Sequence, residues 1–265
     1  MDLRLAGKKA MITGGSAGIG LAVASALGDA GCNIVIAARD TGRLAAAAAA
    51  LQARLGRAVE IEACDVGIDS THEWLAERHP EVDILVNNAG AIPGGSLDHI
   101  DQAGFRAAWE LKVFGFIGMT RAYYRRMCMR RTGVIINVIG ASDSRGDPAY
   151  IAGSMGNAAL AAMTRALGAE APDHGVRVAA VSPGAVFTSR QEGVLRRQAE
   201  IQFGDADRWM DFVKAFPFAR MARPEEVADT VAFLASPRAG YISGTVVNVD
   251  GGMSQRHKWW PNPNG

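Results

Sequence analysis

The chain has 265 residues, of which 49% are hydrophobic and 21% charged, and its formal net charge is +1. This is the composition of an ordinary globular protein, and the balanced charge gives no global electrostatic case for binding nucleic acid or an anionic membrane. The N-terminus lacks the layout of a signal peptide, and no apolar run is long enough to span a bilayer. The three cysteines are widely spaced and form no CxxC pair, which argues against a disulfide framework and for a reducing compartment, so we expect a cytoplasmic protein. No two histidines have metal-ligand spacing, so we expect no metal site.

Short apolar runs alternate with longer segments of helical periodicity along the chain. The runs predict strands at 9–13, 33–38, 59–63, 82–86, 133–138, 176–181 and 245–249. The segments between them predict helices at 19–30, 41–55, 70–78, 103–130, 150–171 and 224–235. This alternation predicts one α/β domain over 1–265, with a Rossmann-like, doubly wound parallel sheet of about seven strands and helices on both faces.

A glycine-rich turn, TGGSAGIG (13–20), follows the first predicted strand and opens the first predicted helix. A turn of this kind lets backbone N–H groups approach a pyrophosphate, which the positive end of the helix dipole also favours. The sequence therefore predicts a nucleotide site formed by Gly14, Ser16, Gly18, Ile19 and Gly20.

The second predicted strand ends in AARD (37–40), with Arg39 followed by Asp40. In dinucleotide folds an acid at this point binds the ribose hydroxyls, whereas an arginine accommodates a 2′-phosphate. Because Arg39 comes first, NADP is favoured, with NAD as the alternative.

Six motifs in order resemble the short-chain dehydrogenase/reductase family: TGGSAGIG, CDV (64–66), NNAG (87–90), SPGAVFT (182–188), RPEEVA (223–228) and SGTVVNVDGG (243–252). The resemblance implies a bound nicotinamide cofactor and a homo-oligomer, a dimer or tetramer packed through 103–130 and 150–171. It also implies roles around the cofactor for Asp65, Val66, Asn87, Ala89, Gly90, Pro183, Gly184, Val186 and Thr188.

The catalytic positions depart from the family's pattern. Family members usually work with Asn, Ser, Tyr and Lys, in which the Tyr hydroxyl exchanges a proton with the substrate and the Lys lowers the Tyr pKa. Ungapped alignment of the flanking segments places Lys112, Gly140, Gly153 and Asn157 at these four positions.

The same residue types recur nearby. Tyr150 precedes Asn157 by about two helical turns, with Ser154 between them, and Ser142 lies two residues beyond Gly140. We therefore predict a displaced catalytic group of Tyr150 and Lys112, with Ser142, Ser154 and Asn157 orienting the substrate. The competing interpretations are that Tyr150 only caps a loop, that Ser142 belongs to a polar turn, and that Lys112 pairs with Glu110 or Asp143.

Two further segments have open roles. Residues 187–216 carry aromatic side chains among many charges after a strand's end, which is typical of a substrate lid or a surface excursion. Their aromatic content suggests a partly apolar small-molecule substrate. The tail 257–265, HKWWPNPNG, either docks on a neighbouring subunit or is flexible, and docking is favoured.

Three functions remain open at this point. The first is an NAD(P)-dependent oxidoreductase that transfers hydride between nicotinamide and a carbonyl or alcohol with a displaced acid–base group. The second is a lyase, isomerase or dehydratase that keeps the nucleotide as structure, and the third is a nucleotide-binding protein without turnover. The first is favoured, and it rests on the family resemblance because a fold alone does not determine function.

Overall fold

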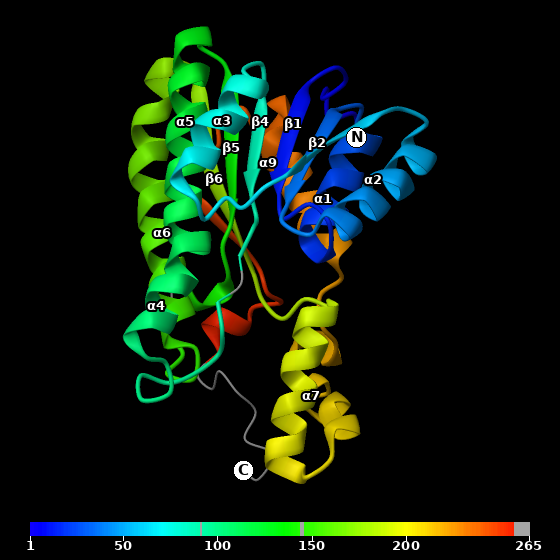
Figure 1. Cartoon of the computed structure of the whole chain (residues 1–265), viewed down its shortest axis with the longest axis vertical. Helices are drawn as coiled ribbons and strands as arrows, with labels where there is room; N and C mark the ends of the chain where they lie inside the picture. Colours follow the sequence, from blue (N-terminus) through cyan, green and yellow to red (C-terminus); the bar gives the residue numbers. More distant parts are fainter. Residues whose placement is uncertain (91, 144–145, 257–265) are drawn as a thin grey trace.

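The computed structural model describes residues 1–90, 92–143 and 146–256, and its centre is one parallel sheet (Figure 1). The strand order is β3-β2-β1-β4-β5-β6-β7, and every neighbouring pair is parallel. The strands are β1 (Lys9–Thr13), β2 (Asn33–Ala38), β3 (Val59–Ala63), β4 (Ile84–Asn87), β5 (Gly133–Val138), β6 (Val176–Pro183) and β7 (Val246–Val249). The predicted sheet is confirmed, and all seven strands lie within two residues of their predicted bounds.

Helices cover both faces of the sheet. The helices are α1 (Gly18–Asp29), α2 (Thr41–Leu55), α3 (Asp69–Arg78), α4 (Gln102–Trp109), α5 (Gly115–Arg130), α6 (Ile151–Glu170), α7 (Ser189–Phe203), α8 (Met210–Val213) and α9 (Pro224–Ala235). Helices α1, α2 and α9 pack on one face and α3, α5 and α6 on the other, as the separate hydrophobic clusters of the two faces show. The doubly wound arrangement is therefore confirmed.

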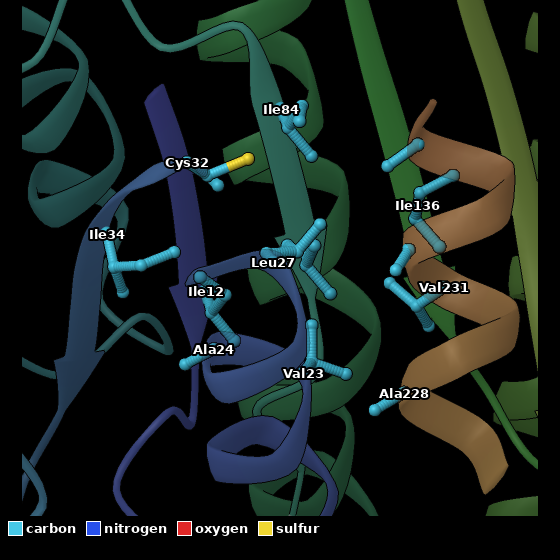
Figure 2. Close-up of a cluster of buried hydrophobic side chains, with 14 of the residues drawn as sticks. Ile12, Val23, Ala24, Leu27, Cys32, Ile34, Ile84, Ile136, Ala228 and Val231 are labelled. Atoms are coloured by element: carbon cyan, nitrogen blue, oxygen red, sulfur yellow. The ribbon is translucent and has the colours of Figure 1, made fainter. Parts of the chain in front are cut away.

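The core on the α1 and α9 face joins helices that are far apart in the sequence. Val23, Ala24 and Leu27 of α1 point toward the sheet, and Val231 of α9 packs beside Ile136 of β5 (Figure 2). These side chains are almost fully buried, and burial of each Val, Leu or Ile side chain contributes roughly 1.5–3 kcal/mol of transfer free energy. This packing fixes the N-terminus of α1 at the carboxyl end of β1, where the glycine-rich turn lies.

The predicted helix 103–130 is interrupted. A π-helical turn, η1 (Glu110–Phe114), separates α4 from α5 and carries Lys112. Such turns are rare and frequently occur at functional sites. The periodicity of the sequence does not reveal this turn, because one extra residue per turn leaves the apolar pattern on either side intact.

Segment 187–216 folds into α7, a 3-10 turn and α8, which extend beyond the carboxyl ends of the strands (Figure 1). Leu195 and Ala199 of α7 pack with Phe212 and Phe216 in a hydrophobic cluster, which Met221 and Met253 complete from outside the segment. The segment is therefore an ordered unit placed at the sheet's ligand-binding edge. The predicted docking tail 257–265 lies outside the described residues. No helix in the described ranges is long and apolar enough to cross a membrane.

Candidate active site

The glycine-rich turn has the conformation that a phosphate site requires. Gly14 and Gly18 have φ angles of +67° and +53°, in the left-handed region that favours glycine. Helix α1 begins with Ala17 as its N-cap, and no side chain caps its first N–H groups. A Cβ built on Gly18 would lie 3.1 Å from Cγ2 of Thr188, so the loop after β6 closes over the turn. Ser16 and Ile19 are half-buried in the same turn.

The carboxyl ends of β1 and β4 are joined by a residue that the sequence prediction omitted. Asn88 donates its side-chain N–H to the carbonyls of Thr13 and Gly14, at 3.1 and 3.3 Å. The backbone N–H groups of Asn88 and Ala89 donate to the Thr13 hydroxyl at 2.9 and 3.1 Å. The neighbours β1 and β4 are the point at which the chain order of the sheet reverses, where ligands of such folds bind. Asn88 therefore holds the predicted cofactor loops together.

The charged residues at the end of β2 have separate roles. The Asp40 carboxylate caps α2 by accepting the backbone N–H of Arg43 at 2.9 Å. The Arg39 side chain is 60% exposed, and its guanidinium lies 3.6 Å from the carboxylate of Asp65. Asp65 also accepts the backbone N–H of Gly67 at 2.8 Å. Arg39 is therefore the accessible group at the point where a nucleotide ribose binds in this type of fold.

Asn87 is a structural residue within the sheet. It is fully buried, and its side-chain N–H₂ donates to Thr120 at 3.0 Å and to Asn137 at 2.9 Å. Asn137 in turn donates to Thr164 of α6 at 3.0 Å. This network ties α5, β4, β5 and α6 together directly behind the site. Val66 is buried, and its carbonyl is within 2.8 Å of the His72 ring.

The residues predicted after β6 follow the strand into α7. The backbone N–H of Gly184 donates to Val249 of β7 at 3.0 Å, which extends the sheet beyond Pro183. Val186 is buried, and the Thr188 hydroxyl caps α7 by accepting the N–H of Gln191 at 3.2 Å. The segment is thereby held against both the sheet and the glycine-rich turn.

Lys112 is buried, and no carboxylate among the described residues pairs with it. Its ammonium donates to the carbonyl of Val138, at the end of β5, at 2.6 Å and lies 4.4 Å from the centre of the Phe116 ring. Burial, and then the charge of Arg190, lower the pKa of Lys112 from its ordinary value to about 7. The expected alternative of pairing with Glu110 or Asp143 is wrong: Glu110 is exposed, and Asp143 instead accepts the Ser182 hydroxyl at 2.8 Å.

The Lys112 side chain lies against Gly90 of the NNAG motif. A Cβ built on Gly90 would lie 2.8 Å from Cδ and 3.5 Å from Nζ of Lys112. The absence of a side chain at position 90 therefore leaves the space through which Lys112 reaches the end of β5. The Lys112 amine thus lies beside the loop that the family pattern assigns to the cofactor.

Tyr150 fills the space beside Gly153. A Cβ built on Gly153 would overlap ring carbons Cε1 and Cζ of Tyr150. Tyr150 is the N-cap of α6, and its ring packs in a small cluster with Ile92, Ala108 and Ala152. Burial raises the pKa of Tyr150, and the charge of Arg190 opposes this effect. The cation acting on Tyr150 is therefore Arg190 and not, as predicted, Lys112.

Asn157 turns toward the segment that follows β5. Its side-chain N–H₂ donates to the Ser142 hydroxyl at 3.0 Å, and a Cβ on Gly140 would lie 2.8 Å from Asn157 Nδ2. Asn157 and Ser142 are both buried. Ser154 instead accepts the backbone N–H of Asp147 at 3.0 Å and so holds the loop before α6. The side chains of Lys112 and Asn157 thus converge on 138–142 from opposite helices.

Arg190, which the sequence prediction omitted, connects α7 to the loop after β4. Its guanidinium donates to the carbonyls of Gly90 at 2.8 Å and Ile92 at 2.6 Å. The only sequence signal for it is its place two residues beyond Thr188, at the end of a family motif. Within the described ranges, no group of three His, Cys, Asp or Glu side chains could hold a metal ion.

Comparisons with known proteins agree on one family. Residues 14–254 match the family model described as enoyl-(acyl carrier protein) reductase. The chain is 32% identical to 3-oxoacyl-[acyl-carrier-protein] reductase of Synechocystis sp. over 94% of this chain and 98% of that protein. It is 35% identical to galactitol 2-dehydrogenase of Rhizobium johnstonii over 95% of this chain and 96% of that protein.

A solved structure gives the same result. L-Sorbose reductase from Gluconobacter frateurii, in complex with NADPH and L-sorbose, superposes with a TM-score of 0.90 at 30% identity, covering 97% of this chain and all of that chain. The family model, the sequence relatives and the solved structure match the chain over nearly its whole length. The chain belongs to the short-chain dehydrogenase/reductase family.

Proposed function

We propose that the protein is an NAD(P)-dependent oxidoreductase that transfers hydride between a nicotinamide and a carbonyl or alcohol substrate, using a relocated acid–base group. It is then an atypical member of its family, with Lys112, Gly140, Gly153 and Asn157 at the usual catalytic positions. The observation that supports the proposal is that the Tyr150 ring fills the space where a side chain on Gly153 would lie. Position 153 is the one that the sequence alignment gives to the family's tyrosine.

The residues of the turn after β1 fit a nicotinamide dinucleotide. The uncapped N-terminus of α1 and the left-handed glycines offer N–H groups to a pyrophosphate. Arg39 is accessible at the end of β2, whereas the Asp40 carboxylate is engaged in the cap of α2, and this favours NADP over NAD. When bound, the cofactor supplies or accepts the hydride.

Lys112 is suited to exchange a proton near neutral pH. An amine with a pKa of about 7 is present in both its charged and its neutral form under these conditions, which is the best state for a general acid or base. During ketone reduction, the ammonium gives a proton to the substrate oxygen and becomes a neutral amine. During alcohol oxidation, the neutral amine accepts that proton.

Tyr150 is suited to hold the substrate oxygen. Its raised pKa keeps the phenol protonated near neutral pH, so the hydroxyl donates a hydrogen bond and does not act as a base. The pair of Asn157 and Ser142 adds polar groups at the end of β5 and orients the substrate beside it.

We further propose a lid and a homo-oligomer. The lid is 187–216, because its helices form an ordered unit beyond the carboxyl ends of β4 and β6. The homo-oligomer packs through α5 and α6. Exposed apolar side chains near the N-terminal ends of the two helices support this proposal: Phe114 just before α5, Ile117 in α5 and Met155 in α6.

The first experiment is a turnover assay of the purified protein with NADPH and NADH. The panel contains keto-sugars, polyols and 3-oxoacyl thioesters, chosen from what the relatives act on. We expect hydride transfer with NADPH and at least one ketone or secondary alcohol. Tight NADPH binding without turnover across the panel contradicts the redox proposal and favours a lyase, isomerase or non-catalytic role.

A further inference from the structure

Arg190 makes a fork of hydrogen bonds across the candidate site. It belongs to the first turn of α7, yet its two terminal nitrogens donate to the carbonyls of Gly90 and Ile92, at 2.8 and 2.6 Å. These carbonyls follow β4 and are about a hundred residues away in the sequence. Arg190 therefore joins the candidate lid to the loop against which Lys112 lies.

Arg190 also provides the positive charge that acts on both candidate acid–base groups. Its charge favours the neutral form of Lys112 and opposes the effect of burial on Tyr150. Helix α6, which packs against the turn that carries Lys112, begins after Tyr150 as its N-cap. The segment after β5 carries Asp143, whose carboxylate accepts the Ser182 hydroxyl. On its own helical turn, Glu110 is exposed. In the described part of the chain, Lys112 therefore faces a second cation and forms no ion pair.

We propose that Arg190 is a positioning residue that couples the docking of α7 to the protonation state of Lys112. This inference rests on the proposed function for its catalytic meaning, but its physical content concerns only Arg190 and Lys112. When α7 is docked, the guanidinium is held by two carbonyls at a place where its charge repels a proton on Lys112. When α7 moves away, Arg190 moves with it and Lys112 holds its proton more tightly.

The coupling has a direct use in ketone reduction. Proton transfer breaks an N–H bond of the Lys112 ammonium, forms the O–H bond of the product alcohol and leaves a neutral amine, which water protonates again. A nearby positive charge destabilises the ammonium relative to the amine and so favours this transfer. The proton is then released most readily while the lid covers the substrate.

The test separates the charge of Arg190 from its hydrogen bonds. Arg190→Gln removes the charge, whereas Arg190→Lys keeps a charge but cannot donate to both carbonyls as a planar fork does. Arg197→Gln is the matched control, because Arg197 is an exposed arginine on the same helix. The chain contains only the lysines Lys8, Lys9, Lys112, Lys214 and Lys258, so NMR of protein labelled at lysine Cε follows each amine, with Lys112→Met assigning its signal.

We expect the Lys112 titration to move to higher pH in Arg190→Gln, to stay nearer the wild type in Arg190→Lys, and to be unchanged in Arg197→Gln. An unchanged Lys112 titration in Arg190→Gln overturns the inference, whether or not any substrate is known. Turnover in the assay combined with that null result leaves the proposed function standing. A shifted titration in a protein without turnover supports the coupling while the redox proposal fails.

Kinetics give a second readout once a substrate is found. In Arg190→Gln the pH dependence of kcat/KM should shift in the same direction as the Lys112 titration, and KM should rise about tenfold through loss of the two lid contacts. Arg190→Lys should raise KM with a smaller shift of the pH profile. A rise in KM with an unmoved pH profile in Arg190→Gln shows a purely structural latch and contradicts the coupling.

Discussion

The two sides of the candidate site differ in the groups that form them: backbone groups on one side and side chains on the other. On the side of β1 and β2, the site consists of backbone: a turn with left-handed glycines, an uncapped helix N-terminus and the carbonyls that Asn88 holds together. On the side of β5 and α6, it consists of long side chains that arrive from separate elements. Lys112 comes from a π-helical turn, Tyr150 from the start of α6, and Arg190 from α7.

This difference would explain the proposal that the first side keeps the family pattern while the second departs from it. A backbone site depends on φ angles and close approach, so glycines at fixed positions are needed. A proton-transfer group needs only a suitable atom, an appropriate pKa and reach. In the proposed site, side chains from neighbouring positions meet this need, and the structure shows the space for them: Gly153 leaves room for the Tyr150 ring and Gly90 for the Lys112 side chain.

The largest effect on kcat is expected from removing the amine of Lys112 or the hydroxyl of Tyr150. Lys112→Met and Tyr150→Phe should each lower kcat by roughly 10²–10⁴-fold, because each removes a group that we propose donates to the substrate oxygen. NADPH binding, measured by fluorescence titration, should change little. Lys214→Met and Tyr241→Phe are matched controls at exposed positions. Wild-type kcat in both site variants contradicts the relocated group.

Blocking the space beside Tyr150 should also be costly. Gly153→Ala places a methyl group inside the Tyr150 ring, which must move, and we expect kcat to fall about 100-fold. The control is Gly193→Ala on α7, where a Cβ meets nothing within 4 Å. Gly153→Ala and Gly193→Ala both raise helix propensity, by up to about 1 kcal/mol. A fall in kcat that occurs only in Gly153→Ala therefore reports the steric conflict with Tyr150. Equal kcat in the two variants shows that Tyr150 has no role.

Burial of Lys112 should make stability depend on pH. The folded pKa of about 7 is below that of an unfolded lysine, so the unfolded chain binds more protons between these values and stability rises with pH. From pH 7 to pH 9 this group should add roughly 2 kcal/mol to the free energy of unfolding. Urea unfolding of the wild type and Lys112→Met at both pH values isolates the contribution of Lys112 to the free energy of unfolding. An identical pH dependence in the two proteins contradicts the burial of the Lys112 amine.

The smallest effect is expected on the side of β1 and β2, where we propose that the exposed Arg39 side chain selects NADP over NAD. Arg39→Ala should raise the Kd for NADPH about tenfold and leave that for NADH nearly unchanged, through loss of a charge-assisted contact to the 2′-phosphate. Arg43→Ala is the control, since Arg43 is 75% exposed on the next helix. A parallel loss of both cofactors in Arg39→Ala contradicts the proposed NADP preference.

The sequence predicts the sheet well, because buried strands and amphipathic helices carry their period in the residue types. It also predicts the glycine-rich turn, because glycines at fixed spacing between a strand and a helix are a local feature of the sequence. It does not reveal the π-helical turn at Lys112, the Tyr150 ring beside Gly153 or the fork of Arg190. These depend on side-chain direction and on contacts between residues far apart in the chain, as with Arg190 and Gly90, and no local pattern encodes them.

The most direct test of the relocated group is a crystal structure with NADPH and a substrate or unreactive analogue bound. We predict that the substrate oxygen lies within about 2.6–3.2 Å of the Tyr150 hydroxyl or the Lys112 amine, directly or through one water. A substrate oxygen that contacts neither group, with Lys112 still directed only at Val138, contradicts the account.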